Sequence, residues 1–562
     1  MLNLHKSVYL LIICVGSLAS AQAQPPRIFF SDLESGPNTG GRNNAGVWVT
    51  IWGKGFGDER GTSTITVGSG AVANYPVWTD TKITFQLGSK TKSGEIFVHE
   101  GKLQSNGIPF AVRAGKIYFV STTGRDFHRG SFISPWKSIR KAKDSLSPGD
   151  TAYIEDGVTQ KSEETFTAYL SMDRHGGDNS GKQNAPKALA AYPGAAVTIG
   201  VERGLAYGIR TPNIGVRTDY WVISQLHLIA GTQAMDVSGI GWRIVGNEMQ
   251  CPGADNQVGC VQLNGSTEVQ FYGNEVHNAG PAPASSKFYH AVYFSTDSNH
   301  IDVGWNHIHD NYTCRAIQFH SSPLCSPSCG AADQTGSDQF DLYVHDNVIH
   351  GDNCNAINFA TVDPSKGPVE AYNNLIYHVG LMDPKGEGGG AFSCIYVAGI
   401  TYHGSPPGGA VEVFNNTLSD CGANHTRDAD GSRGAFAIGG PRSLTLHLRN
   451  NIVDQKSGEV YLDGSKSQIS GDHNLWFGLG NGPSQTSNNV NADPQFVDPS
   501  AFDFHLKQSS PAKDAGVSTH SDNPFGNGRV TDLDGLSRPQ GTAFDIGAYE
   551  LPGSGKPAQP NQ

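Results

Sequence analysis

Trp242-Arg-Ile-Val-Gly-Asn247 and Val269-Gln-Phe-Tyr-Gly-Asn274 are the first two copies of a phrase that occurs seven times before residue 455. Each copy is a short alternating apolar strand, then an asparagine, then a second apolar strand. The later copies end at Asn306, Asn347, Asn374, Asn416 and Asn451. Successive asparagines are 27 to 42 residues apart, so the strand is constant while the inserted loops vary. This pattern predicts a solenoid whose coils bury one face against their neighbours.

A second strand aligns across the same coils, over residues 233–238, 259–264, 290–295, 315–320, 355–360 and 393–398. Because side chains alternate along a strand, its apolar positions face the interior and its polar positions face outward. The predicted outward column is Asp236, Gln262, Tyr293, Gln318, Asn358 and Tyr396. Amide, phenol and carboxylate groups stacked at about 4.8 Å suit hydrogen bonding and stacking against a sugar chain. An ordinary solvated face is the alternative.

A column of histidines follows the asparagine phrase. His277, His309 and His350 occupy the same register in three consecutive coils, and their neighbours Val276 and Ile308 are predicted to point inward. We expect the imidazoles to face outward and to help bind substrate. Two alternatives stay open: a structural ladder satisfied by loop carbonyls, or a metal site built from the three rings.

Ionisable residues are concentrated in the middle coils, and they suggest acid/base chemistry. We predict a catalytic group of His290, Tyr293, Arg315 and His320. Histidine exchanges protons near neutral pH, and arginine pairs with a carboxylate through two hydrogen bonds. Lys287 and Tyr312 join the predicted substrate-binding residues.

Residues 24–113 have a different pattern, with short alternating strands separated by Gly, Asn and Pro turns, which predicts a small β-sandwich. Val49-Thr-Ile-Trp-Gly-Lys-Gly-Phe-Gly57, closed by Ser105-Asn-Gly-Ile-Pro-Phe-Ala-Val112, resembles the immunoglobulin-like IPT/TIG domain. The resemblance implies an adhesive or spacing module, and we assign it no chemistry.

From residue 114 the chain resembles right-handed parallel β-helix proteins of the polysaccharide lyase type. The resemblance rests on Ile117-Tyr-Phe-Val-Ser121, on the segment Ser134-Pro-Trp136 to Leu146, and on Asn491-Ala-Asp-Pro-Gln-Phe-Val-Asp498. Ser134 and Pro135 favour a helix start, so we predict a helix that caps the first coil. The fold class is therefore all-β, with a β-sandwich followed by a β-helix over 114–552 and a disordered tail over 553–562. This scaffold is shared by lyases, hydrolases, epimerases and adhesins, so it implies no single reaction.

Composition and the first residues indicate where the protein works. An apolar run from Val8 to Ala19 precedes Ala21-Gln22-Ala23, which predicts a signal peptide over 1–23 and export. No other stretch is long and apolar enough to insert into a membrane. The net charge of -12 argues against a nucleic-acid partner. We expect a monomer that acts on a polysaccharide.

Eight cysteines remain after cleavage at this site, an even number that makes disulfides plausible in an oxidising compartment. Cys251 and Cys260 flank one loop, Cys325 and Cys329 share another, and Cys314 and Cys354 occupy the same register in consecutive coils. Buried free thiols are the alternative for the last pair. The connectivity does not follow from the spacing.

The leading functional hypothesis is a secreted enzyme that cleaves an acidic, uronate-containing polysaccharide by β-elimination. Arg315 would neutralise the uronate, His290 or His320 would act as base, and Tyr293 as acid. The alternatives are a glycoside hydrolase or epimerase on the same scaffold, for which Asp236, Asp310 and Asp352 are available, or a non-catalytic glycan-binding surface protein. We predict no cofactor. Calcium at Asp428 and Asp430 is a weaker expectation, because one Asp-x-Asp is most often solvated.

Overall fold

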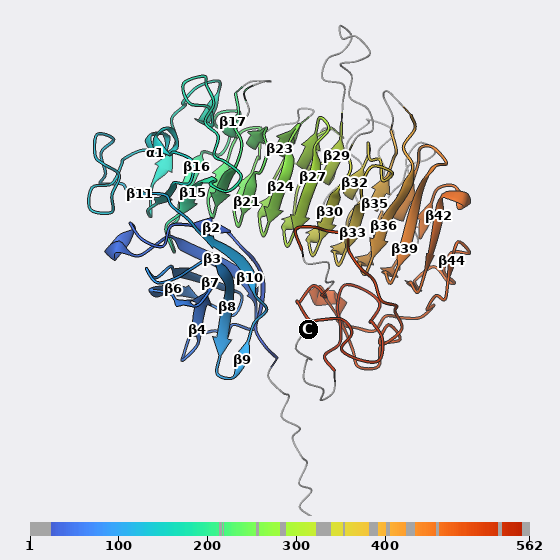
Figure 1. Ribbon diagram of the computed structural model, residues 1–562. Coiled ribbons are helices and arrows are strands. Elements are labelled where there is room, and N and C mark those ends of the chain that lie inside the picture. Colours follow the sequence, from blue (N-terminus) through green and yellow to red (C-terminus); the bar gives the residue numbers. More distant parts are fainter. Residues whose placement is uncertain are drawn as a thin grey trace, which may run out of the picture.

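The structure is a computed structural model of the 562-residue chain. It describes residues 24–553, apart from 213–215, 217, 254–257, 282–287, 322–338, 352–353, 381–391, 401–404, 423–432, 457–459 and 527–530. The predicted signal peptide and all but the first residue of the predicted tail lie outside the described residues. The chain forms a long solenoid, and a small N-terminal sandwich and a folded C-terminal segment lie along the same side of it (Figure 1).

The N-terminal region is a β-sandwich, as predicted. One sheet has the order β1-β3-β7-β6, and the other contains β2, β10, β8, β4 and β5, with β9 paired to β8. The strands are β1 (Arg27–Ser31), β2 (Ser35–Gly36), β3 (Trp48–Lys54), β4 (Thr64–Val67), β5 (Gly70–Ala71), β6 (Asn74–Trp78), β7 (Lys82–Gln86), β8 (Gly94–Glu100), β9 (Leu103–Gln104) and β10 (Ile108–Val112). A short 3-10 helix, η1, spans Arg42–Asn44. The short alternating strands expected from the sequence are therefore present.

From β11 to β44 the described chain winds into a β-helix with three parallel sheets. Each sheet is named by its number of strands. The 13-stranded sheet comprises β11 (Ile117–Val120), β12 (Thr151–Ile154), β15 (Lys187–Ala191), β18 (Trp221–Ser224), β21 (Arg243–Val245), β24 (Thr267–Tyr272), β27 (Asn299–Gly304), β30 (Leu342–His345), β33 (Val369–Tyr372), β36 (Gly409–Phe414), β39 (Leu444–Arg449), β42 (Ile469–Asp472) and β44 (Thr486–Ser487). The 11-stranded sheet comprises β13 (Thr159–Gln160), β16 (Thr198–Gly200), β19 (His227–Ile229), β22 (Glu248–Gln250), β25 (Glu275–His277), β28 (His307–His309), β31 (Val348–His350), β34 (Leu375–Tyr377), β37 (Thr417–Ser419), β40 (Ile452–Asp454) and β43 (Leu475–Phe477). The 10-stranded sheet comprises β14 (Ala168–Ser171), β17 (Tyr207–Arg210), β20 (Gln233–Val237), β23 (Gly259–Asn264), β26 (His290–Ser295), β29 (Arg315–His320), β32 (Asn355–Phe359), β35 (Phe392–Val397), β38 (Arg433–Ile438) and β41 (Leu462–Asp463). The coils from β12 to β41 each contribute one strand to each sheet, whereas the coils at the two ends lack strands in one or two sheets.

The repeated asparagines form a continuous ladder at the corner between the 13- and 11-stranded sheets. The Asn306 backbone N–H and Nδ2 both donate to Asn347 Oδ1, at 3.0 and 2.9 Å, and Nδ2 also donates to the Phe271 carbonyl. The same contacts link every neighbour from Asn247 to Asn451, and continue to an eighth member, Asn474. The residue before each ladder asparagine has a positive φ, such as 65° at Gly246 and 58° at Trp305. The corner therefore needs a left-handed residue followed by a side-chain amide.

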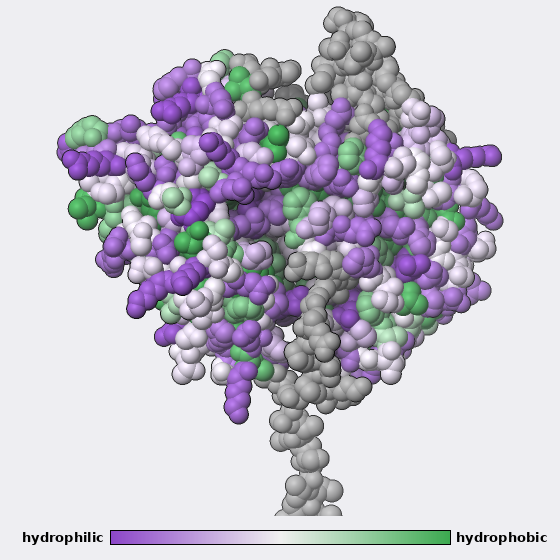
Figure 2. Space-filling model, in the orientation of Figure 1, coloured by the Kyte–Doolittle hydropathy of each residue, from purple (hydrophilic) through white to green (hydrophobic). Residues whose placement is uncertain are grey.

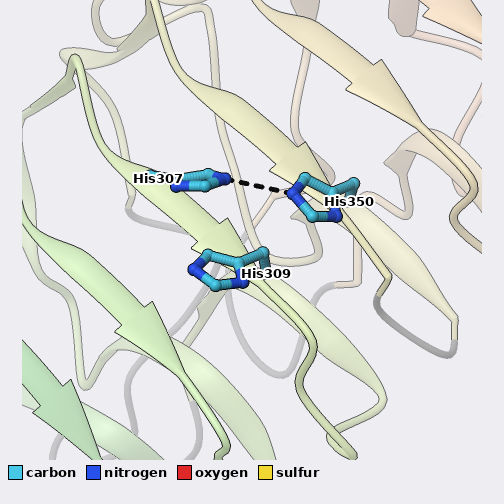
Figure 3. A group of neighbouring side chains, drawn as sticks. All are labelled: His307, His309 and His350. Carbon is cyan, nitrogen blue, oxygen red and sulfur yellow. Dashed lines mark hydrogen bonds between the residues drawn. The ribbon is translucent and has the colours of Figure 1, made fainter. Parts of the chain in front are cut away.

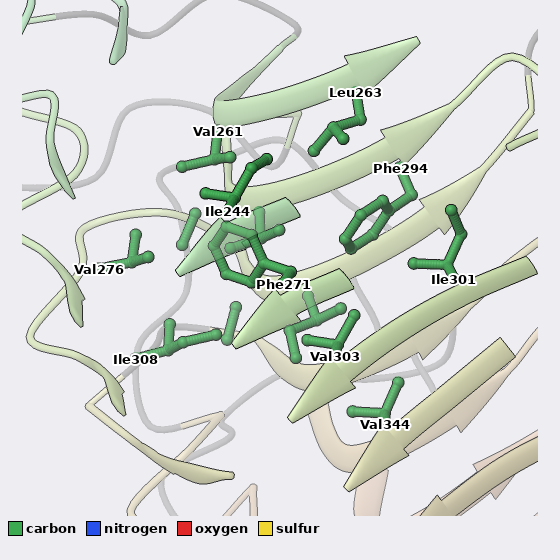
Figure 4. Close-up of a cluster of buried hydrophobic side chains, with 14 of the residues drawn as sticks. Ile244, Val261, Leu263, Phe271, Val276, Phe294, Ile301, Val303, Ile308 and Val344 are labelled. Atoms are coloured by element: carbon green, nitrogen blue, oxygen red, sulfur yellow. The ribbon is translucent and has the colours of Figure 1, made fainter. Parts of the chain in front are cut away.

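Apolar side chains from all three sheets fill the interior. Val261, Leu263 and Phe294 of the 10-stranded sheet meet Phe271 and Ile308 of the other two (Figure 4). Phe294, Phe319 and Phe359 stack along the helix axis, with ring centroids 5.0 and 5.4 Å apart. The inward positions expected from strand alternation are thus confirmed as core.

The capping helix is present but begins later than predicted. Helix α1 spans Ile139–Ser145, and Ser138 caps it by accepting a hydrogen bond from the Lys141 N–H. The Ser134-Pro135 start is wrong because that stretch has a different role. Trp136 forms a parallel bridge with Val120, and Asp126 Oδ1 accepts the N–H groups of Lys137 and Ser138. Ile139, Ala142 and Leu146 join the solenoid core.

The sandwich packs directly against the 13-stranded sheet. Trp48 meets Tyr153 edge to face at 5.0 Å, and the Tyr153 hydroxyl donates to the Trp48 carbonyl at 2.6 Å. Arg243 donates to the backbone carbonyls of Ser31 and Asp32 and pairs with Glu34. The sandwich and the first coils therefore share one core cluster.

The C-terminal segment after β44 folds back along the solenoid. It contains the antiparallel pair β45 (Phe496–Asp498) and β46 (Asp503–Leu506), with the 3-10 helix η4 (Pro499–Ala501) between them. A further 3-10 helix, η3 (Lys466–Gln468), precedes β42. Phe496, Phe504 and Ile546 cover Leu375 and Ile452 on the outer face of the 11-stranded sheet. Lys54 of the sandwich pairs with Asp534 of this segment at 2.5 Å.

Three disulfides link the described cysteines. Cys251 bonds to Cys260 and Cys314 to Cys354, so the noted spacings indicated real pairs, and the free-thiol alternative for the second is wrong. The third, Cys394–Cys421, was not indicated by the spacing. Cys325 and Cys329 lie outside the described residues. The described helices include none long and apolar enough to cross a membrane.

Candidate functional site

The predicted outward column is present on the 10-stranded sheet. Register pairs run without interruption through the strands, in the order Asp236, Gln262, Tyr293, Gln318, Asn358 and Tyr396. Tyr293, Gln318 and Asn358 are nevertheless buried, whereas Asp236, Gln262 and Tyr396 are half-buried. The middle of the column is therefore largely shielded from water.

The four predicted catalytic residues lie together on two neighbouring strands, β26 and β29. His290 pairs in register with Arg315, and Tyr293 lies on the same strand as His290, with the two rings edge to face at 5.1 Å. The Tyr293 hydroxyl and His320 Nδ1 are 3.1 Å apart, within hydrogen-bond distance. The structure thus brings two imidazoles, a phenol and a guanidinium into one cluster, which we call the β26–β29 cluster.

His290 and Arg315 reach this cluster because alternation fails at the starts of the strands. Ala291 and Val292 both belong to the core, as do Ala316 and Ile317, so two successive residues turn inward. The residue before each small alanine is thereby placed on the outer face of the 10-stranded sheet, where the His290 ring meets the Tyr293 ring. Strict alternation would have put the His290 and Arg315 side chains in the interior.

The electrostatics of the cluster favour neutral histidines beside one cation. Burial and the nearby Arg315 guanidinium lower the pKa of His320 to about 4. Burial, Arg315 and His320 together lower the pKa of His290 well below its usual value. Burial also lowers the pKa of Arg315, to about 10, with the Tyr396 and Tyr293 phenols opposing this effect. At neutral pH the guanidinium keeps its charge while both imidazoles can accept protons.

Polar contacts extend the column on both sides of the cluster. Asn358 Nδ2 donates to Gln318 Oε1 at 2.6 Å. At the other end Asp236 pairs with Arg210 at 3.3 Å and accepts a hydrogen bond from Asn264. Asn264 and Arg210 were missed by sequence reasoning. Asn264 lies two residues after Gln262, so alternation does place it on the outward face, whereas Arg210 lies outside the aligned coils.

The predicted histidine column belongs to a different sheet. His277, His309 and His350 are in register on β25, β28 and β31 of the 11-stranded sheet. His277 stacks on His309 at 5.2 Å and His309 on His350 at 5.3 Å. Two of the rings contact carboxylates of this sheet, with Glu248 3.2 Å from His277 and Glu275 3.1 Å from His309, whereas His350 contacts His307. The three rings form a stacked ladder on the outer face of the 11-stranded sheet.

The other predicted binding residues are only partly placed. Tyr312 is half-buried, and its backbone N–H donates to the Ala279 carbonyl on the connection before β29. Lys287, the hydrolase candidate Asp352, and the calcium candidates Asp428 and Asp430 lie outside the described residues.

A hollow of about 1260 Å³ lies between the sandwich, the 13-stranded sheet and the C-terminal segment. His345 lines it and is held between Asp302 at 2.9 Å and Asp346 at 2.6 Å. Burial opposes a charge on His345, but these carboxylates outweigh it and raise its pKa to about 10. Asn523 and Asn373 donate to the same two carboxylates, so this network joins the solenoid to the C-terminal segment. The outer surface around it is mainly hydrophilic, with apolar residues scattered (Figure 2).

Comparison with known proteins supports both parts of the architecture. Residues 35–112 match the model of the IPT/TIG domain. The solved structure of pectate lyase Pel9A resembles the chain with a TM-score of 0.51 and 16% identity, over 78% of this chain and 96% of that one. The scaffold is a parallel β-helix of the pectate lyase type.

More distant likenesses are found among other solved β-helix structures. XylC in complex with xylose covers 78% of this chain and 99% of its own, at 11% identity and a TM-score of 0.47. A GH136 lacto-N-biosidase from Eubacterium ramulus covers 66% and 62%, at 13% identity and a TM-score of 0.40. No curated protein sequence matches the chain. At these identities the similarity concerns the fold.

Proposed function

We propose that the chain is a secreted polysaccharide lyase that cleaves an acidic, uronate-containing polymer by β-elimination on the outer face of the 10-stranded sheet. The observation that carries the proposal is the β26–β29 cluster, which combines a shielded guanidinium with a phenol and neutral imidazoles. β-Elimination requires a cation for the uronate carboxylate, a base for the adjacent C–H and an acid for the departing oxygen.

Each of these three roles can be assigned to one residue of the β26–β29 cluster. Arg315 binds the uronate carboxylate and stabilises the negative charge that develops when the C5 proton leaves. His320 is the better base of the two histidines, because it is half-buried whereas His290 lies almost fully buried beside Tyr293. Tyr293 is the acid, and His290 positions its ring.

His320 and Tyr293 together account for every proton that moves in the reaction. In the tautomer whose Nδ1–H donates to Tyr293, His320 takes the C5 proton on Nε2. The electron pair of that C–H bond forms the C4=C5 double bond, the C4–O4 bond breaks, and the Tyr293 hydroxyl protonates O4. Nδ1–H then returns a proton to the phenolate across 3.1 Å. Acid and base on one side of the sugar suit a syn elimination.

The residues of the outward column favour elimination over hydrolysis. A glycosidase of the usual kind uses two carboxyl groups about 5 to 10 Å apart. Along the described column only Asp236 carries a carboxylate, and it is engaged by Arg210. The remaining column positions, from Gln262 to Tyr396, offer amides and phenols, which suit sugar hydroxyls.

The deciding experiment supplies purified protein with polygalacturonate, alginate, glycosaminoglycans and neutral glycans. Ultraviolet absorbance of the unsaturated uronate and reducing ends are measured together. A lyase yields both signals on an acidic polymer. Reducing ends without absorbance would establish hydrolysis, binding without cleavage would leave a glycan-binding protein, and cleavage of neutral polymers alone would exclude a role for Arg315.

Variants then assign the roles. We expect Tyr293→Phe and His320→Ala to lower kcat by at least about 100-fold, the range of a lost acid or base. Arg315→Ala should lower kcat and raise KM. His447→Ala is the matched control, because His447 pairs with Glu412 on the 13-stranded sheet and not on the sheet that carries the β26–β29 cluster. Full activity of Tyr293→Phe would remove the assigned acid.

A further inference from the structure

A second histidine cluster occupies the 11-stranded sheet, outside the proposed active site. His307 and His309 are two residues apart on β28 and therefore lie on the same face of the strand. His350 lies beside them on β31. His307 Nε2 and His350 Nε2 are 3.0 Å apart, and one ring nitrogen from each of the three residues lies within 4.8 Å of the others. Figure 3 shows the His307 ring directed at His350, with His309 next to both.

The nitrogen spacing fits a single small cation. Zinc binds imidazole nitrogen at about 2.0–2.1 Å, so two ligands of one tetrahedral ion lie about 3.3 Å apart, and about 2.9 Å apart at a right angle. The separation of 3.0 Å between the His307 and His350 nitrogens falls between these values. These two nitrogens can therefore bind one ion at nearly their present separation, and a nitrogen of His309 lies within 4.8 Å of both.

Carboxylates around His309 complete the arrangement. His309 Nδ1 lies 3.0 Å from Asp310 Oδ2, the outer contact that metal-binding histidines usually make. With Nδ1–H donating there, Nε2 presents its lone pair to the centre of the cluster. Glu275, in register with His307, brings Oε1 to 3.1 Å from that Nε2.

We propose that His307, His309 and His350 bind a divalent transition-metal ion such as Zn²⁺, with Glu275 as the fourth ligand and Asp310 as a positioning residue. Three imidazoles with one carboxylate favour Zn²⁺, Ni²⁺ or Cu²⁺ over Ca²⁺ or Mg²⁺, which prefer oxygen ligands. This inference is independent of the proposed lyase function.

The site lies where an ion would stabilise the connections that lead to β29 and β32. The chain leaves His309 for β29 and leaves His350 for β32, and the Cys314–Cys354 disulfide joins these two connections. A metal ion at their beginning and a disulfide at their end would hold both connections. The ion's role is thus structural, in holding the strands that carry Arg315 and Asn358.

The test uses the full mature chain without a histidine tag, because a tag would bind the same ions. Isothermal titration with ZnCl₂, NiCl₂, CaCl₂ and MgCl₂ is combined with Tm measurement by circular dichroism. We expect one equivalent of Zn²⁺ or Ni²⁺ to bind and raise Tm, with no comparable effect of Ca²⁺ or Mg²⁺. Absence of Zn²⁺ and Ni²⁺ binding by the wild-type chain would overturn the proposal.

Substitutions locate the ion. His307→Ala and His350→Ala should abolish the one-equivalent binding, and Asp310→Asn should weaken it by about 10 to 100-fold. His473→Ala is the control, since His473 also contacts a carboxylate, Asp472, but belongs to a distant coil. Co²⁺ absorbance reports the ligand geometry independently of stability. Unchanged binding in a folded double variant, His307→Ala with His350→Ala, would place the ion elsewhere and reject the site.

Discussion

At the scale of single residues, the asparagine ladder shows how one side chain can specify a corner. The side chain of each member accepts hydrogen bonds from one neighbouring coil and donates hydrogen bonds to another. Its amide thereby pairs with backbone groups at the corner. The amide is the one feature that every copy shares, and it was readable from the sequence because asparagine recurs while its neighbours vary.

Replacement of one ladder member should be costly. Asn306→Ala would remove the side-chain hydrogen bonds that Asn306 makes with the buried Asn274 N–H and the Phe271 carbonyl. The loss of each such bond costs about 1–3 kcal/mol, so we expect the free energy of unfolding to fall by about 3 kcal/mol or more. Urea denaturation measures this. Asn481→Ala, at an exposed position, is the control, and an equal loss in both variants would contradict a special role for the ladder.

The low pKa of His320 predicts an unusual pH profile. The base must be neutral, and with a pKa of about 4 it is neutral throughout the range above about pH 5. We therefore expect kcat/KM to remain level from pH 5 to 8 and to fall only on approach to pH 4. Initial rates across buffers of constant ionic strength test this. An acid limb near pH 6.5 would indicate an ordinary, solvated histidine.

His345 predicts a dependence of stability on alkaline pH. Its folded pKa of about 10 exceeds the usual unfolded value near 6.5, so the stabilising charge is fully present below pH 6.5. That contribution decreases as pH rises and is lost through pH 10. Denaturation at pH 6, 8 and 10 should show this decline, and His345→Gln should reduce it. An identical pH dependence in both proteins would exclude His345 as its source.

At the scale of elements, the sequence predicted strands and register better than strand ends. The outward column was predictable because alternation holds through the middle of β23, β26, β29 and β32. The placement of His290 and Arg315 on the outer face of the sheet depends on two successive inward residues, Ala291 and Val292 in the case of His290. Small residues permit such a break, but nothing local requires it, because it depends on packing between coils.

The helix start and the histidine column illustrate the same limit. Ser134 and Pro135 are residues that favour a helix start. The bridge between Trp136 and Val120 nevertheless places this stretch at the edge of the 13-stranded sheet. His277, His309 and His350 were correctly aligned with one another. Their sheet differs from that of the β26–β29 cluster because a connection of variable length separates β25 from β26, and its direction could not be read from spacing.

The Cys314–Cys354 disulfide carries a prediction at this scale. It closes a loop of 40 residues between the connections that lead to β29 and β32. The double variant Cys314→Ala with Cys354→Ala should lower stability by about 4 kcal/mol, as expected for a loop of that length. Guanidinium denaturation tests this, with the shorter Cys251–Cys260 pair removed as comparison. A larger loss from the shorter loop would contradict the entropic account.

At the scale of the whole molecule, the sandwich is part of the fold rather than a flexible spacer. It shares a core cluster with Tyr153, Ala188 and Val222 of the first coils. Deletion of residues 24–113 would expose this apolar surface. We expect the shortened chain to have a lower Tm and a greater tendency to aggregate, as scattering and calorimetry would reveal. An unchanged Tm would mean that the two parts fold independently.

The pairing of Lys54 with Asp534 has a mechanical consequence. Two parts of the chain that are separated by most of its length meet beside the middle coils instead of hanging from opposite ends of the stack. A solenoid commonly frays one repeat at a time from its ends. Here the sandwich covers the first coils and reaches Tyr272 and Trp305, and the C-terminal segment covers Leu375 and Ile452. Unfolding that starts at either end of the stack must therefore also separate these contacts.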